Sequence, residues 1–174
     1  MESLTFSYLE YASGEELIAL LRRVAKQTKK ADPKGASLSS YQNAIATDLG
    51  FSNWSTLHKN LADQPWSKVT GIYSRIMNHD VLGPEVSGLA HRTFDVETAK
   101  QEMREWARAN YSLLINFAYY DKESPTGFAW PDVDMAEELA GEFVGRYPED
   151  LIIEVGNGLD LEEGPWGREE YGED

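Results

Sequence analysis

Gly50 lies between two short segments whose apolar residues repeat at helical spacing, and this arrangement constrains the fold more than any other feature. The segment before it has apolar side chains three and four residues apart, namely Leu38, Tyr41, Ile45 and Leu49. The segment after it has a second stripe, namely Trp54, Leu57 and Leu61. Such spacing places each set on one face of a helix, and a glycine between them favours a tight turn. We therefore predict two short helices packed across a turn, with Ser52 as the cap of the second.

A small residue four positions before a turn glycine is typical of the helix-turn-helix, and Ala46 and Gly50 satisfy this requirement. The second helix departs from the motif. Its apolar anchors would fall at about Thr56 and Lys59, and neither residue is apolar. The second helix is therefore rotated relative to the motif, or it begins out of step with it.

A DNA-binding helix needs polar and basic side chains for base edges, with further cations for phosphates. The candidates for these roles are Arg22, Arg23, Lys26, Asn53, His58 and Lys59. Nearby acids, including Glu15 and Glu16, dilute the positive charge. We keep a DNA-binding regulator that uses residues 14–61 as the alternative function, and only this alternative has nucleic acid as the partner.

Further helices are predicted along the first two thirds of the chain. Ser13 and Glu16 have the spacing of a capping box before a helix at residues 14–29. Pro65 opens another helix, and Asp95 opens the longest one, at residues 96–119. Residues 79–94 contain two glycines and a proline, so we expect a loop there.

The C-terminal third predicts one more helix and a strand. Asp134 is the expected cap of a helix at residues 135–146, and the run from Asp150 to Val155 is the best candidate strand. Residues 3–11 are a second candidate strand or an extended lead-in. The predicted fold class is mainly α, with α+β as the alternative.

We expect three regions in the chain. A helical, helix-turn-helix-like module spans residues 1–64, a helical or α+β region spans residues 65–156, and an acidic tail spans residues 157–174.

The negative charge is concentrated at one end. The whole chain of 174 residues has a net charge of -14, and residues 121–174 have seventeen Asp/Glu against three Lys/Arg. A field of this sign repels phosphate backbones and attracts basic surfaces. The chain has no cysteine, and no apolar run approaches the roughly 20 residues that span a bilayer. With acids where a signal peptide has positive charge, we expect a soluble cytoplasmic protein without a membrane partner.

Two candidate metal arrangements fail, the first because of its spacing and the second because it lacks a residue. His79 and His91 are separated by eleven intervening residues, so capping or surface roles are expected instead of metal ligation. Asp132 and Glu154 resemble the paired carboxylates of a nuclease, but Gly156 stands where the third element needs lysine. We predict no metal, no cofactor and no enzymatic activity.

Residues 17–61 resemble the small helical module at the N-terminus of some bacterial glyoxalase-superfamily proteins. The matching residues are Leu38, Ser39, Ala44, Ala46, Gly50, Phe51, Trp54 and Leu57. The resemblance implies a helical bacterial module found on varied proteins, including those of mobile genetic elements, and it implies no catalytic residue. A glyoxalase domain needs strands with metal-binding His and Glu, which residues 70–174 do not offer.

The sequence therefore favours a protein that binds another protein. An acidic C-terminal surface would engage a partner with a basic surface, such as a nucleic-acid-binding complex, as anti-CRISPR or anti-restriction inhibitors of phage or plasmid origin do. Aromatic residues among acids favour an interface. The predicted contact residues are Glu137, Glu138, Glu142, Asp160, Glu162, Glu163, Trp166, Glu169, Glu170 and Tyr171.

Overall fold

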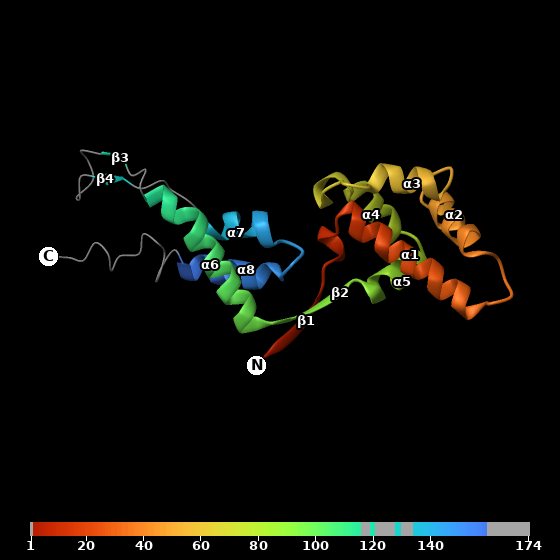
Figure 1. The fold of residues 1–174 in the computed structure, drawn as a ribbon, viewed down its shortest axis with the longest axis horizontal. Coiled ribbons are helices and arrows are strands. Elements are labelled where there is room, and N and C mark those ends of the chain that lie inside the picture. Colours follow the sequence, from red (N-terminus) through yellow and green to blue (C-terminus); the bar gives the residue numbers. More distant parts are fainter. Residues whose placement is uncertain (1, 116–118, 121–127, 130–133, 160–174) are drawn as a thin grey trace. The chain divides into compact units, whose positions relative to one another are not determined.

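A computed structural model describes residues 2–115, 119–120, 128–129 and 134–159 (Figure 1). Within these residues the prediction of a mainly α fold is confirmed, because eight α-helices are accompanied by two pairs of short strands. No helix in the described part of the chain is both long enough and apolar enough to cross a bilayer.

The chain divides into two compact units that we describe separately. The first unit is residues 7–92, and the second unit is residues 1–6 together with residues 93–174. This division differs from the predicted boundary after residue 64, because two helices beyond that point share the first unit's core. Most of the predicted tail, from residue 160 onward, lies outside the described residues, whereas Asn157 and Gly158 belong to a helix.

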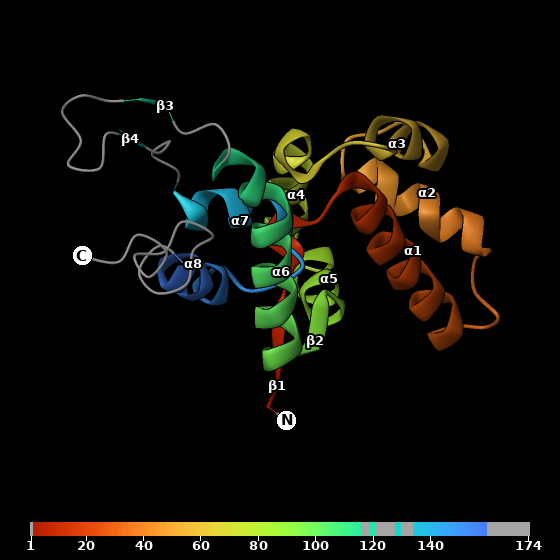
Figure 2. The same cartoon turned by 60° about the vertical axis from the view of Figure 1, so that its left-hand side comes forward.

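Five α-helices build the first unit (Figure 2). They are α1 (Gly14–Ala31), α2 (Leu38–Asp48), α3 (Trp54–Leu61), α4 (Thr70–Met77) and α5 (Leu82–Leu89), with 3-10 turns at Leu9–Tyr11 and Trp66–Lys68. Helix α1 packs against α2, α3 and α5, so it is the centre of the core. Its buried face includes Leu17 and Leu21, which are fully buried together with Leu49 and Leu57.

Side chains cap the N-termini of α1 and α3. The Ser13 hydroxyl accepts a hydrogen bond from Glu16 N at 3.2 Å, and Ser13 N donates to the Glu16 carboxylate, which confirms the predicted capping box. The cap of α3 is Asn53 and not Ser52, because Asn53 Oδ1 accepts the Thr56 N–H at 2.9 Å. The helix thus begins one residue later than predicted.

The turn between α2 and α3 has the predicted tight geometry. Gly50 has a φ of 89°, a conformation in which a side chain is disfavoured. Gly50 N donates to Thr47 O at 3.0 Å and Phe51 N donates to Ala46 O at 2.9 Å. This pair of bonds is a Schellman C-cap, and it satisfies carbonyls that the end of α2 would otherwise leave unpaired.

The prediction of a loop at residues 79–94 is wrong. These residues form α5 and strand β2 (His91–Asp95), which pairs with β1 (Ser3–Ser7). Pro84 is the third residue of α5, where the helix needs no intrahelical N–H donor. His79 Nδ1 accepts the N–H groups of Val81 and Leu82 at 3.2 and 3.0 Å, so this side chain caps the helix start.

The two strands β1 and β2 run antiparallel. Val96 N donates to Glu2 O at 2.9 Å near one end, and Tyr8 N donates to Ala90 O at 3.1 Å near the other. The expected strand at residues 3–11 is therefore present only at residues 3–7. The partner strand could not be predicted locally, because it lies some 88 residues along the chain.

The second unit is built on α6 (Val96–Ile115), α7 (Met135–Phe143) and α8 (Glu149–Gly158), with short strands β3 (Tyr119–Tyr120) and β4 (Phe128–Ala129). Helix α6 packs against both α7 and α8 (Figure 1). The long helix is confirmed, and Asp95 Oδ1 accepts Thr98 N at 2.9 Å at its start. The predicted end at residue 119 is too late, because Tyr119 is in β3.

The predicted strand at residues 150–155 is wrong, because these residues lie in α8. Pro148 precedes the helix, and two acids occupy its first turn, which is a helix-start pattern. The buried side chains are Leu151, Ile152, Val155 and Leu159. That spacing of one, three and four residues covers one helical face, whereas a strand would alternate. Asp134 caps α7 as predicted, and α7 ends at Phe143 rather than at residue 146.

Candidate functional site

The predicted acidic residues of α7 lie on its solvent face. Glu137, Glu138 and Glu142 are exposed, while Met135, Leu139 and Phe143 point into the core. Glu138 and Glu142 are one turn apart and therefore neighbours on the helix surface. Glu138 also accepts a hydrogen bond from the Tyr111 hydroxyl, and burial together with this carboxylate raises the pKa of Tyr111.

Helix α8 adds a second acidic set that sequence reasoning missed. Glu149, Asp150 and Glu154 are all exposed on this helix. They were missed because the segment was predicted as a strand, although Pro148 followed by two acids is the pattern that could have revealed a helix start. Together, α7 and α8 form a helical hairpin whose solvent side is acidic.

The hairpin is closely packed. A Cβ added to Gly156 of α8 would lie 2.5 Å from the Cα of Ala136 in α7, so only glycine fits this crossing. Phe143 at the end of α7 is buried against Trp106 of α6, with ring centroids 5.8 Å apart. The carboxylates of the hairpin are therefore presented on helices that are packed against each other and against α6.

Two cations of the second unit are paired with acids. Lys100 Nζ lies 2.6 Å from Glu154 Oε1, and the Arg146 guanidinium pairs with Glu102. Glu102 also accepts the Tyr147 hydroxyl, and this hydrogen bond, with the help of Arg146, lowers the pKa of Glu102. Among the described residues, Glu137, Glu142 and Asp150 have no hydrogen-bonding or ionic partner for their carboxylates.

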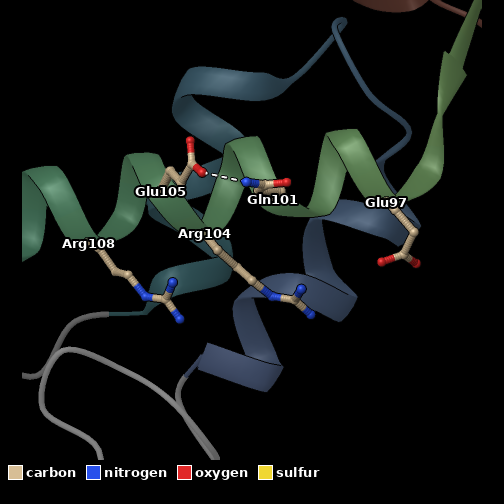
Figure 3. Close-up of a pocket in the computed structure, with 5 residues that line it drawn as sticks. All are labelled: Glu97, Gln101, Arg104, Glu105 and Arg108. Carbon is tan, nitrogen blue, oxygen red and sulfur yellow. Dashed lines mark hydrogen bonds between the residues drawn. The ribbon is translucent and has the colours of Figure 1, made fainter.

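A charged stripe follows one side of α6 and borders a shallow depression of about 310 Å³ (Figure 3). Its side chains are Glu97, Gln101, Arg104, Glu105 and Arg108. Gln101 donates a hydrogen bond to Glu105 at 2.7 Å. The stripe mixes both signs of charge along a single helix, as a solvated helix face does, so it does not select a ligand of one charge.

The remaining predicted acidic contact residues lie outside the described part of the chain. They are Asp160, Glu162, Glu163, Trp166, Glu169, Glu170 and Tyr171.

The residues of the DNA-binding alternative lie on two helices of the first unit. Arg22, Arg23 and Lys26 are exposed on α1, and Lys59 is exposed on α3. Asn53, the exposed cap that precedes α3, uses its Oδ1 to accept the N–H and hydroxyl of Thr56, and His58 on α3 is half-buried.

No metal-binding cluster of three or more His, Asp or Glu side chains occurs among the described residues. His79 Nε2 faces Asp48 at 3.3 Å while its Nδ1 accepts backbone N–H groups, so of the two expected roles, surface or capping, His79 has the capping one. Glu154, the second carboxylate of the nuclease-like pattern, pairs with Lys100, and Asp132 lies outside the described residues.

The fold and this surface define a mainly α protein with an acidic helical hairpin. Neither a family model nor a curated protein nor a solved structure matches the chain. The resemblance of residues 17–61 to the glyoxalase-associated module therefore stays a prediction.

Proposed function

We propose that this protein is a non-enzymatic, protein-binding module whose acidic second unit occupies a basic, nucleic-acid-binding surface of a partner. The observation that supports this proposal is the separation of charge between the two units. The first unit has ten Lys/Arg and eight Asp/Glu, whereas the second has six Lys/Arg and twenty-two Asp/Glu. A single-sign field of this strength steers a basic surface toward the second unit.

The α7–α8 hairpin is the described part of this contact. Glu137, Glu142 and Asp150 are exposed and have no partner of opposite charge among the described residues, so they are available to lysine and arginine side chains. Because close packing at Gly156 joins the helices, little ordering of their backbone is needed on binding.

The concrete form of the proposal is an inhibitor of the anti-CRISPR or anti-restriction type, carried by a bacterium, phage or plasmid. Rows of carboxylates stand in for phosphates, and the acidic segment from Asp160 to Tyr171 extends the contact. Such a protein acts by excluding nucleic acid from its partner, so duplex DNA is expected to compete with it.

The test combines capture with competition. The intact chain is used to capture proteins from a bacterial lysate, and each captured protein is then titrated on labelled duplex DNA with the chain as competitor. A hairpin variant carries Glu137→Gln, Glu142→Gln and Asp150→Asn. At roughly 0.5 kcal/mol for each exposed ion pair, the loss of three carboxylates weakens competition about tenfold.

A matched control removes the same charge elsewhere in the second unit, through Glu2→Gln, Glu97→Gln and Glu105→Gln. This control is expected to compete within about twofold of the original chain. A third variant neutralises the acids from Asp160 to Glu170 and separates the contribution of that segment. If all three variants compete as well as the original chain, the acidic-surface proposal is wrong.

The alternative is a DNA-binding regulator that uses residues 14–61, and one observation favours it. Arg22 and Lys26 are one turn apart on the exposed face of α1, and Arg23 lies beside them. This function predicts a mobility shift of duplex DNA at low salt that weakens steeply as salt increases. Substitution of the three residues by glutamine would abolish it, and no shift at low salt would exclude it.

A further inference from the structure

A groove of about 290 Å³ lies in the first unit, far in sequence from the acidic hairpin. Its apolar floor consists of buried side chains from three helices: Val24 of α1, Ile45 of α2 and Leu82 of α5. The rim includes Val81, whose 58% exposure is the highest among the exposed large apolar side chains of the described residues. The groove thus has an apolar floor and an exposed apolar side chain on its rim.

The charges around this groove have one sign. Asp48 at the end of α2 and Glu85 in α5 border it, and neither lysine nor arginine lines it among the described residues. Asp48 Oδ2 lies 3.3 Å from His79 Nε2. On its other side, His79 Nδ1 accepts the backbone N–H groups of Val81 and Leu82, so the ring is fixed beside Asp48.

Glu85 is the less engaged of the two acids. It is exposed, and its carboxylate has no hydrogen bond or ion pair among the described residues. The groove therefore offers one carboxylate beside a histidine and one without a described partner, above an apolar floor.

From this geometry we propose that the groove binds a lysine or arginine side chain of a partner polypeptide. The methylene stem of such a side chain covers Val24, Ile45 and Leu82, and its cationic head lies between Asp48 and Glu85. Val81 contacts an apolar neighbour of that residue in the partner. This site is separate from the acidic hairpin, so it does not depend on the function proposed above.

The groove favours a side chain over a free amine for two reasons. Asp48 is 52% exposed and Val81 is 58% exposed, so the rim is open on the side from which a polypeptide would present its side chain. A free amine also lacks the apolar neighbours that would cover Val81. A lysine or arginine side chain with apolar neighbours on its polypeptide satisfies both the apolar contact and the charge contact.

The test follows backbone amide signals of the intact, isotope-labelled chain by NMR. The probes are the blocked pentapeptide Ala-Leu-Lys-Leu-Ala, the same peptide with norleucine in place of lysine, and spermidine. The lysine peptide is expected to shift the signals of Asp48, Leu82 and Glu85 saturably. The norleucine peptide keeps the stem and loses the charge, so at these signals it is expected to bind at least about fivefold more weakly.

Two variants test the groove directly. Glu85→Gln removes a carboxylate without a described partner and is expected to lower the affinity for the lysine peptide about threefold. Ala44→Leu, at an exposed position of α2 that lines the groove, fills part of the groove and is expected to weaken both peptides. The hairpin variant is the control and leaves the groove signals unchanged, so failure here and failure of the acidic-surface proposal are distinguishable.

Three results would overturn the proposal. Equal binding of the lysine and norleucine peptides would mean that charge plays no part. Spermidine that shifts the groove signals at the same concentration as the peptide would assign the groove to a free amine. Unchanged affinity in Glu85→Gln, with the variant folded as judged by its amide spectrum, would remove the carboxylate from the site.

Discussion

The two units are built in a similar way but have net charges of opposite sign. Each is built on one long helix, the 18-residue α1 in the first unit and the 20-residue α6 in the second. Each helix buries one apolar face against shorter helices. Yet the first unit has a net charge of +2 from its Lys, Arg, Asp and Glu, while the second has -16. A helix needs only one apolar face for its core, so its solvent face is free to vary with function.

The cores also differ in composition. The buried residues of the first unit's cluster include no aromatic side chain, whereas those of the second include Tyr111 and Phe143. Phe94 and Tyr147 have ring centroids 5.4 Å apart, and Trp106 and Phe143 lie 5.8 Å apart. Aromatic pairs contribute about 0.5–1.5 kcal/mol beyond their area burial. The acidic unit therefore has large packing contacts to offset the repulsion between its carboxylates.

The largest expected effect comes from truncation in the aromatic core. Phe143→Ala is expected to lower the free energy of unfolding by about 3–5 kcal/mol, because it removes a buried ring and leaves a cavity. Leu21→Ala in the first unit is expected to cost about 2–5 kcal/mol. Urea unfolding measures both. The exposed Ile153→Ala is the control and is expected to stay within about 0.5 kcal/mol. A cost below 1 kcal/mol for Phe143→Ala would contradict the described packing.

In each unit, one glycine-to-alanine substitution is expected to lower the free energy of unfolding and another is expected to raise it. Gly156→Ala places a Cβ 2.5 Å from the Cα of Ala136 and is expected to destabilise by about 1–3 kcal/mol. Gly141→Ala meets nothing within 4 Å in α7 and is expected to stabilise by about 0.5–1 kcal/mol through helix propensity. In the first unit, Gly14→Ala and Gly71→Ala are the equivalent pair. Thermal unfolding of the four variants checks the signs, and equal effects within a pair would count against the close helix approaches.

Loss of a helix cap is expected to have a similar, moderate cost in both units. Ser13→Ala removes the hydroxyl of the α1 capping box, and Asp134→Ala removes the carboxylate that accepts Glu137 N at 3.1 Å. Each is expected to cost about 0.5–2 kcal/mol in urea unfolding. Asp134→Asn keeps a capping oxygen and should retain most of the stability. If Asp134→Asn were as damaging as Asp134→Ala, charge rather than capping would be the cause.

The smallest expected effect is on how the free energy of unfolding depends on pH, through a carboxylate of the second unit. The Tyr147 hydroxyl and Arg146 lower the pKa of Glu102 in the folded protein, so its contribution to stability is present above its unfolded pKa of about 4.3. That contribution is lost as the pH falls through the lower, folded pKa. Unfolding curves between about pH 6 and pH 3 are therefore expected to be less pH-dependent for Glu102→Gln than for the original chain. Glu105→Gln is the matched control on α6, and an equal flattening in both variants would exclude Glu102 as the source.

Much of the helical fold was predictable because its signals are local. The capping box at Ser13, the turn at Gly50 and the cap at Asp134 each involve residues within five positions of one another. The apolar stripes of α1 and α6 are local in the same sense, since a helix repeats every 3.6 residues. These elements were predicted with only small errors at their ends.

The errors in the predicted fold occurred where local signals were ambiguous or absent. The short apolar run in α8 suits a strand or a buried helix equally well over six residues, and the packing of α8 on α7 and α6 decided in favour of a helix. Strand β2 and helix α5 were predicted as a loop, because glycine and proline suggested an irregular segment. The pairing of β1 with β2 joins residues 88 positions apart, and no local pattern encodes it.

By itself, the sequence determined the helical stripes, their caps and the concentration of acids toward the C-terminus, because each depends on residue type and short spacing. Only the tertiary structure decided which carboxylates are available to a partner. Glu102 and Glu154 pair with cations from elements 44 and 54 residues away, while Glu137 and Glu142 stay exposed. The groove above Val24, Ile45 and Leu82 likewise exists only after three helices meet. Side-chain exposure and pairing depend on long-range packing, and packing brings together residues that short spacing does not relate.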